Sequence, residues 1–180
     1  MGVTALWAAA LWAFAEASFF FVVPDVLLTL IALFSPREGF LACGAALAGA
    51  LLGGGLLHAL SARNPERLHR FVASVPFIRP YMWTHVRADL EELGWLSIRK
   101  GPMRGIPYKL YAVDAPCCLS LGIFLLASIP GRLERFLVLT ALLALIGWAF
   151  HGPVHRHSTA AALILLAVWS AFYARYWATI

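Results

Sequence analysis

Long apolar runs separated by short polar stretches make up most of the 180 residues of the chain. A helix needs about 20 apolar residues to cross the roughly 30 Å hydrocarbon core of a bilayer. Residues 40–62 reach that length without a charged side chain, residues 160–178 contain one arginine, and residues 133–150 have two charges near their start. These three runs predict transmembrane helices.

Two further apolar regions, residues 3–34 and 94–129, are too long for a single helix, and prolines and charges break each of them near its middle. The first break reads FVVPDV and contains Pro24, whereas the second reads RKGPMRGIPYK and contains Pro102 and Pro107. Irregular backbone at membrane depth is stable only where protein or a water-filled cavity surrounds it. We therefore expect each region to form a re-entrant helical hairpin, which enters and leaves the membrane on the same side.

Each expected hairpin is followed by an uninterrupted span, and this repeated order is typical of inverted-repeat transporters with a site near the middle of the bilayer. The composition also favours a membrane protein, because 62% of the residues are hydrophobic and 13% are charged, whereas soluble domains have about 45–50% and about 25%. The predicted fold is an all-α polytopic membrane protein with two inverted repeats, each a re-entrant hairpin plus a transmembrane helix. A further C-terminal transmembrane helix completes a single integral membrane domain over residues 1–180.

The region between the two hairpins, residues 63–93, is basic and amphipathic, with arginines interleaved with aromatic side chains. Such a segment fits the headgroup region of an anionic leaflet. Nucleic-acid binding uses similar residues, but the flanking membrane segments argue against a nucleic-acid partner. If both hairpins return to the side they entered, one side of the membrane holds twelve Lys and Arg residues, including Arg132 and Arg135, and the other side holds two. The positive-inside rule then places residues 63–93 and the C-terminus in the cytoplasm.

The glycine-rich run contains Gly49 and Gly53, which share one face of a helix. Small residues on one face let membrane helices approach each other closely. We expect this face to pack within the chain rather than between chains, although the same face could also support a homo-oligomer.

Two acidic residues, Glu16 and Asp25, interrupt the first hairpin. An acid at the centre of a membrane helix costs about 2.5–3.5 kcal/mol on insertion scales, so each needs a compensating environment. One alternative for Asp25 is structural, because Pro24 and Asp25 together form a favourable helix start. The alternative for Glu16 is that its side chain reaches the interface.

The second hairpin contains four basic residues, Arg99, Lys100, Arg104 and Lys109. If Pro107 opens a short helix, Lys109 lies in its first turn, where a cation opposes the helix dipole. A bound anion such as a phosphate would reverse that penalty. Alternatively, Arg99 and Lys100 mark the membrane boundary, while Arg104 and Lys109 pair with the two acids. Both interpretations bring an acidic and a basic hairpin together.

Several of these stretches resemble a known family. EASFFFVVPDVLL and SPREGFLACGAALAGALLGGG are similar to the first half of the DedA family, also called the VTT or SNARE-associated domain family, and especially to its short YqaA-like branch. GPMRGIPYKLYAV and SIPGRLERFLVLTALLALIG are similar to the second half, so the resemblance covers residues 10–150. One departure is that Lys109 stands where family members commonly have an arginine, at a shorter spacing from Arg104.

This resemblance implies a double re-entrant-hairpin fold in the bacterial inner membrane and movement of lipid across that membrane. It implies polyprenyl phosphate carriers or phospholipids as substrates, and membrane-embedded acids at Glu16 and Asp25 that take part in proton coupling. The expected partners are therefore membrane lipids that are anionic or carry a phosphate, and no cofactor is expected.

We expect a lipid or lipid-phosphate translocase of the flippase or scramblase type rather than an enzyme. An intramembrane lipid-modifying enzyme is the first alternative, but the sequence contains neither Gly-x-Ser-x-Gly nor His-Glu-x-x-His. His151, His155 and His157 lie in one short loop without an acid or cysteine beside them, so a metal site is not favoured. A non-transporting membrane assembly factor is the second alternative, although such a protein would not need buried acids.

Overall fold

The computed structural model describes residues 2–101 and 105–179, and these residues form helices and connecting segments without a β-strand. The helices of the first half are α1 (Gly2–Ser18), α2 (Asp25–Phe34), α3 (Pro36–Arg63), α4 (Pro65–Ala73), α5 (Pro80–Leu93) and α6 (Trp95–Lys100). Those of the second half are α7 (Tyr108–Asp114), the short 3-10 helix η2 (Ala115–Cys117), α8 (Leu121–Ala149), α9 (His151–Arg156) and α10 (Ser158–Thr179).

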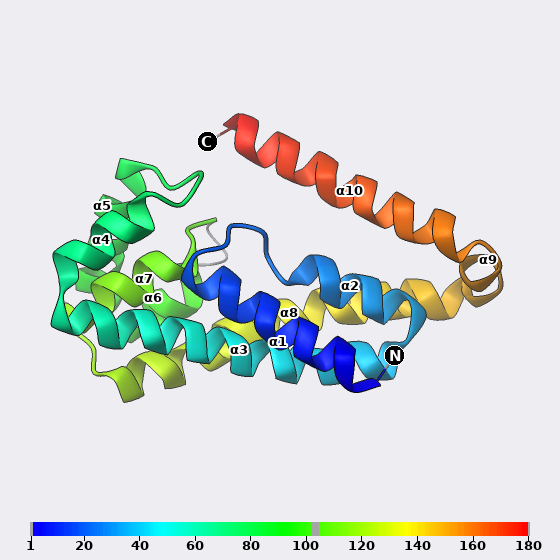
Figure 1. The fold of residues 1–180 in the computed structure, drawn as a ribbon, viewed down its shortest axis with the longest axis horizontal. Coiled ribbons are helices and arrows are strands. Elements are labelled where there is room, and N and C mark those ends of the chain that lie inside the picture. Colours follow the sequence, from blue (N-terminus) through cyan, green and yellow to red (C-terminus); the bar gives the residue numbers. More distant parts are fainter. Residues whose placement is uncertain (1, 102–104, 180) are drawn as a thin grey trace.

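The centre of the molecule is a bundle in which α3 packs against α1 and α8, while α2 packs against α8 (Figure 1). Close approach of α1 and α3 depends on the two glycines of the small-residue face. A Cβ atom on Gly49 would overlap the carbonyl of Ala10, and one on Gly53 would lie 2.6 Å from the carbonyl oxygen of Phe14. The glycine face therefore contacts another helix of the same chain.

The first apolar region forms a helical hairpin of α1 and α2. The start of α1 and the junction between α2 and α3 lie at the same end of the bundle (Figure 1), where the Gly2 amide nitrogen donates to Glu38 Oε1 at 3.2 Å. Residues 19–24 form the break between the two helices, and Pro24 directly precedes the first residue of α2. The break therefore falls where the sequence predicts it.

The second apolar region differs from the expected hairpin followed by a separate span. Instead of ending at residue 129 and restarting at 133, α8 continues from Leu121 to Ala149 with Pro130 inside it. A proline removes one hydrogen bond of a helix, and here the helix continues beyond it. The neighbouring Gly131 lies close to α6, because a Cβ atom there would be 2.9 Å from the Cα atom of Arg99. The proline thus marks a helix crossing and not a helix end.

Two described helices, α3 and α10, are long and apolar enough to cross a membrane, judged by length and composition. They correspond to the predicted spans 40–62 and 160–178. The predicted span 133–150 belongs to α8, in which every 18-residue stretch contains Arg132, Glu134 and Arg135. The length of α8 is sufficient, but its charges lie near its middle.

Residues 63–93 form α4 and α5, whose apolar faces are buried against the protein. Leu68 and Val72 of α4, and Met82 and Val86 of α5, belong to the core, whereas the arginines of this region are exposed. The amphipathic pattern that predicts insertion among lipid headgroups is therefore explained by packing within the chain. The side that remains exposed carries the arginines together with Phe71 and Tyr81.

Candidate functional site

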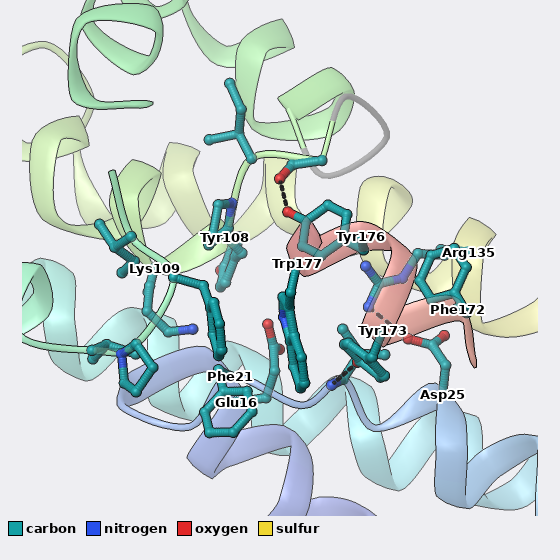
Figure 2. A pocket seen from close by; sticks show the side chains of 18 of the residues that line it. Glu16, Phe21, Asp25, Tyr108, Lys109, Arg135, Phe172, Tyr173, Tyr176 and Trp177 are labelled. Atoms are coloured by element: carbon teal, nitrogen blue, oxygen red, sulfur yellow. Dashed lines mark hydrogen bonds and ion pairs between the residues drawn. The ribbon is translucent and has the colours of Figure 1, made fainter. Parts of the chain in front are cut away.

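A partly enclosed pocket of about 310 Å³ lies where the two breaks, the α4–α5 loop, α8 and α10 meet (Figure 2). One part of its wall is charged and the rest is mainly aromatic. The charged lining residues are Glu16, Asp25, Lys109, Arg132 and Arg135. The aromatic ones are Phe21, Phe77, Tyr108, Trp169, Phe172, Tyr173, Tyr176 and Trp177.

Glu16 of α1 and Arg132 of α8 form a buried ion pair in the pocket wall. Arg132 Nη1 lies 2.8 Å from Glu16 Oε2, with side chains 2% and 6% exposed, at angles outside hydrogen-bond geometry. The guanidinium carbon lies 4.1 Å from the centre of the Tyr108 ring, a favourable cation–π distance. The Tyr108 hydroxyl in turn donates to Ser128 Oγ at 2.8 Å. Tyr108 and Ser128 therefore fix the position of Arg132.

Asp25 opens α2 and also pairs with a cation of α8. Arg135 Nη2 donates to Asp25 Oδ2 at 2.7 Å, and the aspartate side chain is 1% exposed. The structural interpretation of Asp25 as a helix start and its interpretation as part of a charged site are thus both consistent with this geometry.

Lys109 lies in the first turn of α7, which begins directly after Pro107. Its buried Nζ donates to the carbonyl oxygen of Phe20 at 2.9 Å and is attracted by Glu16. The expected pairing of Lys109 with the two acids is therefore corrected, because their ion-pair partners are Arg132 and Arg135. The other predicted residues of this hairpin, Pro102 and Arg104, lie outside the described residues.

Protein side chains satisfy the unwound backbone of the first break. Trp12 Nε1 donates to the Val22 carbonyl at 3.0 Å, and the Val23 amide donates to the Tyr173 hydroxyl at 2.8 Å. Together with the bond from Lys109 to the Phe20 carbonyl, these contacts draw on α1, α7 and α10. Backbone polar groups away from water need such partners, so the break has the support that a non-helical segment inside a membrane requires.

Several charged atoms in this wall have no hydrogen-bond partner among the described residues, namely Glu16 Oε2, Asp25 Oδ1, Arg132 Nε, Arg132 Nη2 and Arg135 Nε. Three of these five atoms are guanidinium donors. The pocket lining contains three cations and two acids, so it carries an excess of positive charge. Guanidinium groups with unused donors favour an oxyanion with several acceptor atoms, such as a phosphate.

The sequence interpretation assigned Arg132 and Arg135 to the cytoplasmic side and so missed their place in the pocket. Their spacing of three residues on one helix was the available signal, because it puts both on the same face. It also did not use the aromatic face of α10, where Trp169, Tyr173 and Tyr176 follow each other at helical spacing.

The histidine-containing loop forms α9, where the rings of His151 and His155 lie 4.3 Å apart. Within the described ranges, no group of three or more His, Cys, Asp or Glu side chains is arranged to hold a metal ion.

Comparison with known proteins adds no relative, since no protein-family model matches the chain and neither the curated proteins nor the solved structures gave a significant match.

Proposed function

We propose that this protein is a lipid or lipid-phosphate translocase of the bacterial inner membrane, with the double-hairpin architecture of the DedA family that its sequence resembles. The observation that carries this proposal is the buried guanidinium group of Arg132, which lines the pocket and has two nitrogens without hydrogen-bond partners among the described residues. The oxygens of one phosphate group could accept hydrogen bonds from Arg132, Arg135 and Lys109 together.

The size and lining of the pocket suit a headgroup rather than a whole lipid. A volume of about 310 Å³ is at the lower end of small-molecule sites. The lipid chain would therefore remain outside, beside apolar helix surfaces such as those of α3 and α10. Binding only the headgroup is the minimum that a protein needs in order to carry it past the hydrocarbon core.

The arrangement of the two halves supports an inverted repeat. In the first half α1, a break and α2 precede the long helix α3, and in the second α6, a break, α7 and η2 precede the long helix α8. In this proposal both breaks lie at membrane depth, and each half supplies one side of the pocket.

Exchange of ion-pair partners would couple lipid movement to protons. When a phosphate occupies the cations, Glu16 and Asp25 lose their partners in a place with little water, and they take up protons. When the phosphate leaves, the acids release protons and the pairs with Arg132 and Arg135 form again. This cycle needs no cofactor.

The test is translocation of labelled lipid in liposomes that contain the purified protein, comparing a polyprenyl phosphate with phosphatidylethanolamine. We expect transport of at least one of them, and its loss in Glu16→Gln and Lys109→Ala. The matched control is Arg37→Gln, which removes an exposed cation outside the pocket. If the lipid is chemically changed rather than moved, the protein is a lipid-modifying enzyme. If it is neither moved nor changed, the assembly-factor alternative replaces the translocase.

A further inference from the structure

Most of the charged wall of the pocket is shielded from the outside in this conformation. Arg132 and Lys109 are 1% and 2% exposed, and the unpartnered guanidinium nitrogens are buried. Buried donors without partners are unfavourable, and movement of part of the surrounding protein would uncover them for an anion.

The helix α10 is loosely held compared with the central helix α3. Only 6% of its most apolar stretch is buried, compared with 44% for α3. Tyr173 is the one buried residue among the side chains described in α10. Figure 1 shows α10 running back from α9 and standing apart from the bundle for much of its length.

The contacts that hold α10 are concentrated at the pocket, and they reach both halves of the chain. Trp169 Nε1 donates to Thr29 Oγ1 of α2 at 3.0 Å, and the Tyr173 hydroxyl accepts from the first break. The Tyr176 hydroxyl donates to the carbonyl oxygen of Gly105 in the second break at 2.8 Å. Release of this one helix would therefore open the pocket and free polar groups of both breaks.

The end of α10 is fastened by an aromatic cluster. The ring of Trp177 stacks on Phe77 of the α4–α5 loop, with centroids 4.4 Å apart and planes 3° from parallel. Phe21 of the first break meets both rings edge-on, at 5.5 Å from each. Phe77 has a φ of 68°, a conformation that is strained for a bulky residue. The stack is therefore maintained against a backbone preference of the loop.

We propose that α10 is a lateral gate, which pivots near α9 and is latched over the pocket by the stack of Trp177 on Phe77. Opening lets a headgroup enter the pocket sideways, from the lipid that surrounds α10. The proposal rests on the proposed function only for the identity of the molecule that enters.

The first experiment measures gate position without any substrate. Spin labels are attached to cysteines at the exposed positions Thr84 of α5 and Ala174 of α10, in a background without the three native cysteines, and the distance between them is recorded by pulsed electron resonance. Aromatic pairs are weak enough that losing the stack should raise the population of the longer distance roughly two- to tenfold. We expect this for Trp177→Ala and for Phe77→Gly.

Phe77→Gly and the control Trp148→Ala separate loss of the stack from general damage to the fold. Phe77→Gly removes the ring and at the same time relieves the left-handed conformation, so it is not expected to unfold the loop. Trp148→Ala is the matched control, because Trp148 of α8 is 74% exposed and lies outside the pocket. An unchanged distance distribution in both Trp177→Ala and Phe77→Gly would overturn the latch.

The second experiment closes the gate. Phe77→Cys and Trp177→Cys are introduced together and joined with a short reducible bifunctional reagent, and lipid translocation is measured before and after reduction. Loss of translocation on cross-linking and its return on reduction support the gate. Full translocation in the cross-linked protein would overturn the gate while leaving the translocase intact. No translocation by the wild-type protein would overturn the proposed function, whereas the distance measurement would still decide whether α10 moves.

Discussion

At the scale of single residues, the ion pair of Glu16 and Arg132 is the most consequential feature, because both charges are withdrawn from solvent. Removing one partner of a buried pair costs about 3–5 kcal/mol, whereas replacing both by neutral groups is often tolerated. We predict that Arg132→Met lowers the thermal unfolding temperature in detergent more than the double variant Glu16→Gln/Arg132→Met does.

Lys109 also attracts Glu16. It therefore makes the difference in unfolding temperature between Arg132→Met and the double variant smaller, but the double variant should still unfold at the higher temperature. The single variant Glu16→Gln completes the cycle and isolates the pairwise contribution. A loss of stability in the double variant that equals the sum of the losses in the two single variants would show that the pair is not coupled in the folded protein.

Tyr108 has two separable contacts, its ring with Arg132 and its hydroxyl with Ser128. Tyr108→Phe keeps the ring and removes a hydrogen bond worth about 1 kcal/mol. Tyr108→Leu also removes the cation–π contact, worth about 0.5–2 kcal/mol, and leaves unfilled space. We predict a small loss of stability for the first variant and a clearly larger one for the second. Equal losses in denaturant unfolding would show that the ring does not hold Arg132.

The charged residues differ in how visible they were in the sequence. Glu16, Asp25 and Lys109 stand out because each interrupts an apolar run or follows a proline. Arg132 and Arg135 follow Pro130, which resembles a helix boundary, so the sequence predicts that they lie on the cytoplasmic side. Only the continuity of α8 through Pro130 turns them toward the pocket, and no local pattern predicts that continuity.

At the scale of helices, the approach of α1 to α3 depends on Gly49 and Gly53, where an added side chain would meet α1 backbone. We predict that Gly49→Leu and Gly53→Leu lower the folded yield and the unfolding temperature in detergent. The expected loss of stability is about the 1–3 kcal/mol typical of overpacking. The matched control is Gly44→Leu on the same helix, where a Cβ atom has nothing within 4 Å. Leucine favours a helix interior more than glycine does, so comparable losses for all three variants would mean that the close approach at Gly49 and Gly53 does not govern the result.

Helices that follow from a continuous apolar pattern were predicted more accurately than those shaped by packing. The spans expected at 40–62 and 160–178 correspond to α3 and α10, and the break around Pro24 separates α1 from α2. The amphipathic pattern of residues 63–93 coincides with α4 and α5, whose apolar side chains pack on the protein itself. A sequence does not distinguish a face that inserts into lipid from one that packs on its own protein, because both are apolar.

At the scale of the whole molecule, the pocket lowers the count of cations on the side of the membrane that the sequence predicts to be cytoplasmic. Lys109, Arg132 and Arg135 line the pocket, so under the orientation expected from the sequence they leave nine of the twelve cations counted on the cytoplasmic side. Two remain on the opposite side. The asymmetry still favours α4 and α5 on the cytoplasmic side.

The fold also restricts which segments can share a side. The junction of α2 with α3 and the helix α9 lie at one end of the molecule, and α4 and α5 lie at the other (Figure 1). Contact between α2 and α9 agrees with this view. Two long apolar helices, α3 and α10, run between the ends. An orientation in which α3 and α10 both cross the membrane therefore places Ser35 and Ser158 on one side and Ser74 on the other.

We predict that single cysteines at Ser35 and Ser158, in a background without native cysteines, react with a membrane-impermeant maleimide applied to intact cells. A cysteine at Ser74 should react only after the membrane is permeabilised. Protection of all three positions in intact cells would contradict a membrane-spanning arrangement with this orientation. Labelling of Ser74 alone from outside would be consistent with the same fold in the reversed orientation. The distribution of cations would then not determine the topology. Labelling of Ser35 and Ser74 from the same side would instead show that α3 does not cross the membrane, and the translocase proposal would then lose its structural basis.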